Sequence, residues 1–157
     1  MKKLFIILLL LLSNSLMAQE SKIETSNPRI NNPFGIMINF GGPSLLLSAS
    51  VDYYVNSNVN IEVGTGFIGA FAGAKYHFNG EQETKKWTPY LGLYLTHIPR
   101  ITFFNSVPPR NGFYIPVGIQ YMSTNGFTFG FELAGISLEN IAGGSPVWGA
   151  LKLGYHF

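Results

Sequence analysis

After residue 33, most of the chain alternates between large apolar side chains and small or polar ones. A period of two residues is typical of a β-strand whose two faces meet different surroundings, because successive side chains point to opposite sides of the sheet. The last segment is the clearest case, since Leu151, Leu153 and Tyr155 alternate with Lys152 and Gly154. One face suits lipid and the other suits a packed polar interior.

The same alternation occurs in seven earlier segments, separated by Gly, Pro, Asn and Ser. Asn125-Gly126, between two alternating segments, is a strong signal for a β-hairpin. The eight predicted strands are residues 34–40, 44–54, 59–67, 71–78, 88–97, 113–121, 127–135 and 147–157.

Two places in this pattern are irregular. Around Gly69 the connection between strands is so short that one long strand at 59–78 is an alternative, which would leave an odd total of seven. Bacterial membrane barrels have even strand numbers, so we favour two strands here. Pro116 lies inside a predicted strand and lacks an N–H group, so we expect a bulge or an unpaired position there.

The first 18 residues have the order of a secretory signal peptide. Lys2 and Lys3 precede an apolar run at 4–12, and small or polar residues lead to Ala18. This run has about nine residues, whereas a membrane-spanning helix needs roughly 20. We therefore predict a cleaved signal peptide at 1–18, a loosely ordered polar leader at 19–33 and a single barrel domain at 34–157.

Composition narrows the class of protein. Charged residues make up 11% of the chain, against about 25% in soluble domains, which suggests that water does not cover much of the surface. The absence of cysteine excludes disulfides and thiolate chemistry. The chain has ten basic and eight acidic residues, and removal of Lys2 and Lys3 with the signal peptide would leave a net charge of zero. The charge therefore gives no reason to expect nucleic-acid binding.

No later segment approaches 18 consecutive apolar residues, so any membrane-spanning structure must be a closed barrel. The predicted fold is all-β: an eight-stranded, antiparallel, up-and-down transmembrane barrel. With the N-terminus in the periplasm, successive connections alternate between the two sides. This parity sends 98–112 and 137–146 outward, and 79–87 and 123–126 inward.

The chain ends in Gly154-Tyr155-His156-Phe157, and its final strand closes on an aromatic residue. This ending resembles the assembly signal of outer-membrane barrels, with Tyr155 and Phe157 as the matching residues. Together with the export signal and the eight strands, it makes residues 34–157 similar to the small OmpA/OmpX-type barrels. The resemblance implies a Gram-negative outer-membrane location, insertion by the barrel-assembly machinery, and contact with outer-membrane lipid and lipopolysaccharide.

Several ionisable side chains fall on the face predicted to point inward. In a narrow eight-stranded barrel, opposite charges should pair across the lumen rather than stand alone. Strand order makes neighbours of Glu62 and Lys75, and of Glu132 and Lys152. A structural role is favoured over a polar path for protons or solutes, because eight strands enclose no open pore. The predicted lumen network is Asp52, Glu62, Lys75, Glu132 and Lys152, with His77 and His156 on the same faces.

Candidate catalytic and metal-binding groups are few. His97 lies near an outward loop with Ser106 and Ser137, but acyl transfer needs a histidine, a hydroxyl and an orienting acid in contact. No His-x-Ser-Asn pattern of the kind found in lipid A deacylases occurs, and the three histidines are isolated in sequence. We therefore predict no enzymatic activity, no cofactor and no metal.

The outward loop at 98–112 is the most distinctive segment outside the strands. Arg100 and Arg110 would suit lipopolysaccharide phosphates, while Phe103 and Phe104 would suit acyl chains or an unknown surface partner. The other reading is a proline-stiffened loop folded over the barrel mouth.

The leading hypothesis is a structural or surface-interaction barrel with no open pore. One alternative is an outer-membrane lipid-modifying enzyme, which would need a histidine, hydroxyl and acid cluster at the outer rim. Another is a soluble, lipocalin-like binding barrel in the periplasm, with its apolar faces turned inward. Charges on the opposite faces favour the membrane version, because a hydrophobic ligand cavity would not accommodate them.

Overall fold

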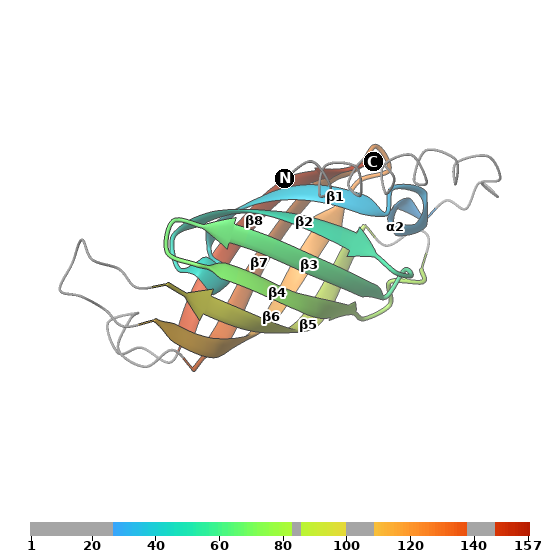
Figure 1. The fold of residues 1–157 in the computed structure, drawn as a ribbon. Coiled ribbons are helices and arrows are strands. Elements are labelled where there is room, and N and C mark those ends of the chain that lie inside the picture. Colours follow the sequence, from blue (N-terminus) through green and yellow to red (C-terminus); the bar gives the residue numbers. More distant parts are fainter. Residues whose placement is uncertain (1–26, 83–85, 100–108, 138–146) are drawn as a thin grey trace, which may run out of the picture.

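The chain forms a closed barrel of eight antiparallel strands in which each strand pairs with the next and β8 pairs with β1 (Figure 1). This computed structural model describes residues 27–82, 86–99, 109–137 and 147–157. The strands are β1 (Phe34–Gly41), β2 (Leu47–Tyr54), β3 (Val59–Gly66), β4 (Ala70–His77), β5 (Trp87–Ile98), β6 (Arg110–Met122), β7 (Phe127–Ile136) and β8 (Val147–His156). The predicted all-β, eight-stranded fold is confirmed.

The region around Gly69 contains two strands and a tight turn. The Gly66 N–H donates to the Gly69 carbonyl at 2.7 Å, and this bond closes the connection between β3 and β4. A side chain at Gly69 would overlap the carbonyl oxygen of His97. The glycine therefore permits the short turn that made the sequence pattern ambiguous.

Pro116 interrupts the hydrogen-bonded ladder without adding a bulge. Strands β5 and β6 keep the same register before and after the proline, since Leu91 pairs with Val117 and Tyr94 pairs with Tyr114. Between these pairs, Gly92 and Leu93 of β5 are not paired with β6. A side chain at Gly92 would come within 2.9 Å of the Pro116 ring. The expected irregularity is therefore an unpaired position, with glycine making room for the proline opposite it.

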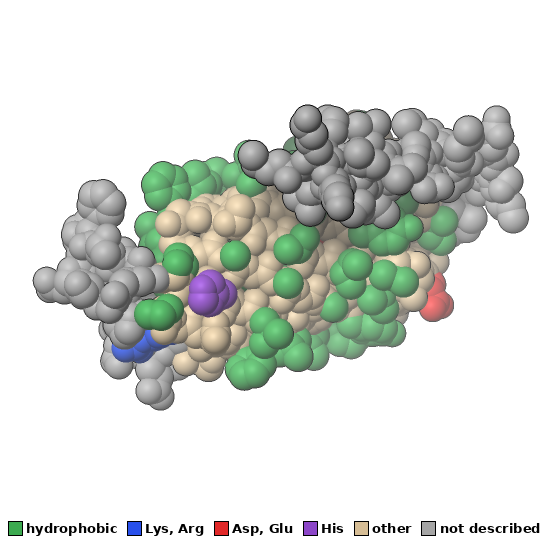
Figure 2. All heavy atoms as spheres, in the orientation of Figure 1, with side chains coloured by type: hydrophobic (Ala, Val, Ile, Leu, Met, Phe, Trp, Pro, Cys, Tyr) green, Lys and Arg blue, Asp and Glu red, His purple; other side chains and the backbone are tan. Residues whose placement is uncertain are grey.

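Most large apolar side chains of the strands lie outside the barrel, and the buried charged side chains lie inside. Strand β5 shows this clearly, since Leu93 and Leu95 are 55% and 61% exposed while Tyr94 between them is fully buried. Figure 2 shows hydrophobic side chains spread along the barrel wall, with charged ones on this face only near its two ends. The alternation of apolar and polar residues in the sequence thus produces an apolar outer wall and a polar inner face.

The connections alternate between the two ends of the barrel. One end, called here the α2 end, carries the short helix α2 (Pro28–Asn31) and the connections after β2, β4 and β6. The opposite end carries the connections after β1 and β3 (Figure 1). Strands β5 and β7 end there at Ile98 and Ile136, and β6 begins at Arg110, so the first and last residues of the predicted loop 98–112 belong to strands. Within the described residues no helix is long and apolar enough to cross a membrane.

The opposite end of the lumen is filled by an apolar cluster. After β1, the 3₁₀ turn η1 (Gly42–Ser44) brings Leu45 inward, where it is 4% exposed with a φ of 73°. A leucine in this left-handed region is uncommon, and burial of its side chain offsets the backbone strain. Leu45 packs in a cluster with Phe71, Tyr94, Ile98, Tyr114, Ala134 and Ile136.

The expectation of a loosely ordered leader is wrong for its last residues. Asn27 caps α2 by accepting a hydrogen bond from the Arg29 N–H at 3.0 Å, and Pro28 occupies the first turn. Arg29 is fully buried. A four-residue helix has no apolar periodicity, so only the Asn-Pro pair in the sequence signals this helix start.

Candidate functional site in the barrel lumen

The five predicted lumen residues are all buried, and each comes from a different strand of the barrel. Asp52 on β2 lies directly opposite Glu62 on β3, and Lys75 reaches them from β4. The Lys75 ammonium is 3.0 Å from Glu62 and 4.0 Å from Asp52. Small residues on the same inward faces, such as Gly73 opposite Glu62, leave room for these long side chains.

Lys152 joins the two halves of this network. Its ammonium lies 2.9 Å from Glu62 and 3.6 Å from Glu132. Glu132 is on the adjacent strand β7, whereas Glu62 is on β3 and is reached only across the lumen. The structure brings together both neighbour pairs named from the sequence, and adds this cross-lumen pair.

Tyrosine hydroxyls complete the coordination of the two glutamates. Tyr94 donates to Glu62 at 2.6 Å, and Tyr90 and Tyr114 donate to the two oxygens of Glu132 at 2.5 and 2.8 Å. Hydrogen bonds to a carboxylate are stronger than neutral ones, and they satisfy the remaining lone pairs of buried ions. The alternation along β5 and β6 turns these three tyrosines inward, but no local sequence pattern marks them as carboxylate partners.

A hydroxyl, an imidazole and a carboxylate meet near the α2 end. The Thr128 hydroxyl oxygen is 2.8 Å from Nδ1 of His156, whose Nε2 is 3.2 Å from Asp52. This order resembles that of a hydrolytic triad. However, all three side chains are buried, and the Thr128 hydroxyl also lies 3.1 Å from the Gly126 carbonyl. The cluster is therefore built as part of the lumen packing rather than as an accessible nucleophile.

The outer-rim candidates are not assembled into a catalytic group within the described residues. His97 is exposed and its Nδ1 lies 2.7 Å from the side-chain oxygen of Asn111. The Ser137 hydroxyl accepts a hydrogen bond from the Phe113 N–H at 2.8 Å, and Ser106 lies outside the described residues. Among the described side chains, no three His, Asp or Glu residues are grouped as metal ligands.

The surface loop falls largely outside the described residues, including Arg100, Phe103 and Phe104. Arg110, the first residue of β6, is half-buried opposite Ile98 of β5.

At the chain end, Phe157 is exposed and exchanges two backbone hydrogen bonds with Phe34, at 2.8 and 3.3 Å. Its ring also packs near Tyr155. The carboxy-terminal residue thus takes part in closing β8 onto β1.

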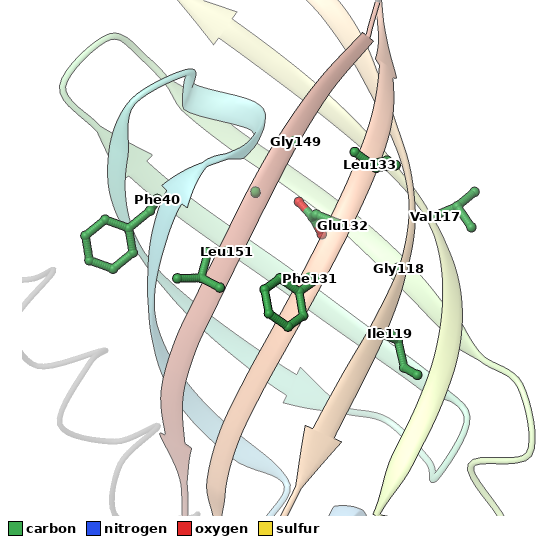
Figure 3. A pocket seen from close by; sticks show the side chains of 10 residues that line it. Phe40, Val117, Gly118, Ile119, Phe131, Glu132, Leu133, Gly149 and Leu151 are labelled. Carbon is green, nitrogen blue, oxygen red and sulfur yellow. The ribbon is translucent and has the colours of Figure 1, made fainter.

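A shallow apolar groove of about 540 Å³ lies on the outer wall, across β6, β7, β8 and the end of β1. Figure 3 shows Leu133 and Leu151 on this outer surface, whereas Glu132 between its apolar neighbours points into the barrel. Gly149 lies opposite Leu133, and because glycine has no side chain, a hollow remains between the larger side chains around it. The groove belongs to the apolar exterior, and Glu132 is the one charged residue among those that line it.

These features define the class: a closed, eight-stranded, up-and-down barrel with an apolar exterior and buried ion pairs in its lumen. No protein-family model matches the chain, and no curated protein matches it. Among solved structures, it is similar to the crystal structure of the N-terminal β-barrel domain of Pseudomonas aeruginosa OprF. The two chains are 21% identical with a TM-score of 0.57, and the match covers 80% of this chain and 98% of that one. This likeness shows a shared fold.

Proposed function

We propose that this chain is a small integral outer-membrane barrel with a structural or surface-interaction role and no open pore. The observation that carries the proposal is the inverted polarity of the fold. Large apolar side chains are exposed along all eight strands, while lysine and glutamate side chains are fully buried within them. Water would disfavour such an exterior, whereas the hydrocarbon of a bilayer would stabilise it.

The same polarity argues against a soluble, lipocalin-like barrel. Such a protein would turn its apolar faces toward a ligand cavity and its polar faces toward water. Here the middle of the lumen holds Glu62, Lys75 and Lys152 in direct contact, so a hydrophobic ligand would have to displace paired charges.

Three layers of side chains argue against an open pore. The apolar cluster around Leu45 fills one end, the ion pairs around Lys152 fill the middle, and Arg29 lies buried at the α2 end. Eight strands leave space for side chains and little else.

The proposed outer-membrane location also implies which partners the chain would contact. Outer-membrane lipid and lipopolysaccharide would contact the exterior, and the barrel-assembly machinery would recognise the final strand with Tyr155 and Phe157. A surface partner would contact the opposite end, where Arg110 begins β6. The fold alone does not favour an enzyme, and no described cluster at that end supplies the acid that His97 would need.

The experiment that tests the location is heat modifiability of the full chain in separated bacterial membranes. We expect the unboiled protein to migrate differently from the boiled protein on a detergent gel, and only in outer-membrane fractions. Recovery in the soluble periplasm without a migration shift would overturn the proposal.

An arginine introduced on the outer wall tests whether this wall faces lipid, which closure of the barrel alone does not show. Leu93 lies mid-strand and outward on β5, so Leu93→Arg should destabilise the barrel by about 2 to 4 kcal/mol in lipid. The matched control is Phe67→Arg, because Phe67 is 83% exposed at the end of β3. Urea unfolding in lipid vesicles measures both. Equal, small effects of the two arginines would indicate that Leu93 faces water.

A further inference from the structure

Residues 27–32, called here the plug segment, are tied to separate turns at the α2 end. The Asn27 side-chain amide donates to the Gly80 carbonyl at 2.7 Å, and the Asn32 amide donates to the Thr124 carbonyl at 3.3 Å. Next to the segment, the Tyr54 N–H donates to the Pro33 carbonyl at 2.8 Å. The plug segment therefore bridges connections that lie on different sides of the barrel mouth.

Arg29 is the part of the plug segment that enters the barrel. Its guanidinium donates to the Thr88 hydroxyl oxygen at 2.8 Å and also hydrogen-bonds to the Tyr54 hydroxyl. Thr88 is on β5 and Tyr54 is on β2, so the two acceptors come from distant parts of the wall. A rigid, planar group with five N–H donors suits separated acceptors better than an ammonium does.

The surrounding hydrogen bonds prepare these two oxygens to accept. The Gln120 amide donates to the Tyr54 hydroxyl at 3.1 Å, which leaves the Tyr54 proton for Nε2 of His77 at 3.4 Å. His77 Nδ1 then donates to Thr88 at 3.2 Å, and the Thr88 proton points to the Gln120 carbonyl at 3.5 Å. With a neutral His77 protonated on Nδ1, the hydroxyl protons of Tyr54 and Thr88 both have acceptors, and both hydroxyl oxygens face the guanidinium as acceptors.

Charge balance is a second, independent observation. Among the described residues, the buried carboxylates are Asp52, Glu62 and Glu132, and the buried lysines are Lys75 and Lys152. Counting histidines as neutral, this set lacks one positive charge, and buried Arg29 supplies it. An uncompensated charge in a buried network is strongly destabilising.

We propose that the α2 end of the barrel is a guanidinium-binding site, which the chain fills with its own Arg29 and thereby holds the plug segment in place. The acceptors come from β2 and β5, so the site exists only after the strands have assembled. Arg29 therefore binds as the last step and latches the closed barrel. The proposal concerns the chain itself and does not depend on which membrane side the α2 end faces.

Chemical rescue of the full chain tests the site. In detergent micelles, Arg29→Ala should lower the midpoint of heat-induced unfolding by about 4 °C or more. Methylguanidinium should restore at least half of this loss in a saturable way, while methylammonium at the same millimolar concentration should not. Rescue should disappear when Thr88→Val is added. Equal effects of the two cations, or an unchanged midpoint in Arg29→Ala, would overturn the proposal.

A second measurement keeps Arg29 in place and reads the docking directly. Thr88→Val removes the hydroxyl acceptor at nearly constant volume, while Thr88→Ser keeps it as a matched control. Trypsin should cut after Arg29 in folded Thr88→Val and leave this bond intact in the wild-type and Thr88→Ser chains. If Thr88→Val resists cleavage as well as Thr88→Ser does, the Thr88 hydroxyl does not hold the guanidinium and the site is wrong.

Discussion

At the scale of single residues, Lys152 is the buried lysine that links two glutamates from different strands. Its ammonium contacts Glu62 and Glu132 and also lies 5.4 Å from the centre of the Tyr94 ring. A buried ion pair need not add net stability over an apolar replacement of both partners, but breaking one leaves an uncompensated charge. Lys152 therefore contributes to stability mainly by neutralising Glu62 and Glu132.

Lys152→Met should lower the free energy of unfolding by about 3 to 5 kcal/mol, because both glutamates would share only Lys75 as a nearby buried lysine. Urea unfolding in micelles measures this loss. The control is Lys86→Met at an exposed position before β5, which should change stability by no more than about 0.5 kcal/mol. Similar small effects of both substitutions would show that water reaches the lumen and screens its charges.

At the scale of elements, the turn between β6 and β7 shows how local geometry fixes the end of the barrel. Gly126 has a φ of 93°, and its carbonyl accepts a hydrogen bond from the His156 N–H at 2.8 Å. The Asn-Gly pair in the sequence thus marks the turn, and its glycine also accepts the hydrogen bond that joins this turn to the end of β8.

Gly126→Ala should destabilise the barrel by at least about 2 kcal/mol, because the added carbon would overlap the His156 carbonyl and the backbone angle disfavours alanine. Gly135→Ala on β7 is the control, since nothing lies within 4 Å of a carbon added there. The yield of the heat-resistant form after refolding measures both. An unimpaired Gly126→Ala chain would mean that this turn relaxes freely away from β8.

Strand positions were predictable because a barrel wall imposes a strict period of two on every element that spans it. The same rule identified the inward charges, and adjacency gave the pairs Glu62 with Lys75 and Glu132 with Lys152. Contacts across the lumen, such as Lys152 with Glu62, depend on how the barrel closes and leave no local pattern. Arg29 was missed for a similar reason, since nothing in a six-residue polar segment shows that it folds back into a mouth formed by residues far along the chain.

At the scale of the whole molecule, the lumen is arranged in layers from apolar at one end to charged in the middle and polar at the α2 end. Arg29 lies at the α2 end, where it donates to Thr88, and Asp52 belongs to the buried ion pairs of the middle layer. The described buried charges then sum to zero along the axis. A barrel wall surrounded by hydrocarbon would make this balance more important, because little solvent is available to screen a residual charge.

A double substitution tests this balance. Arg29→Ala removes one buried positive charge, and Asp52→Asn removes one buried negative charge, so the pair together restores neutrality. We expect the double variant to be more stable than the sum of the two single losses by about 1 to 3 kcal/mol, measured by urea unfolding. Glu81→Gln is the matched control, because Glu81 is an exposed carboxylate in the connection after β4. Combined with Arg29→Ala it should be additive, and additivity of Asp52→Asn as well would show that Arg29 acts through its hydrogen bonds and not through its charge.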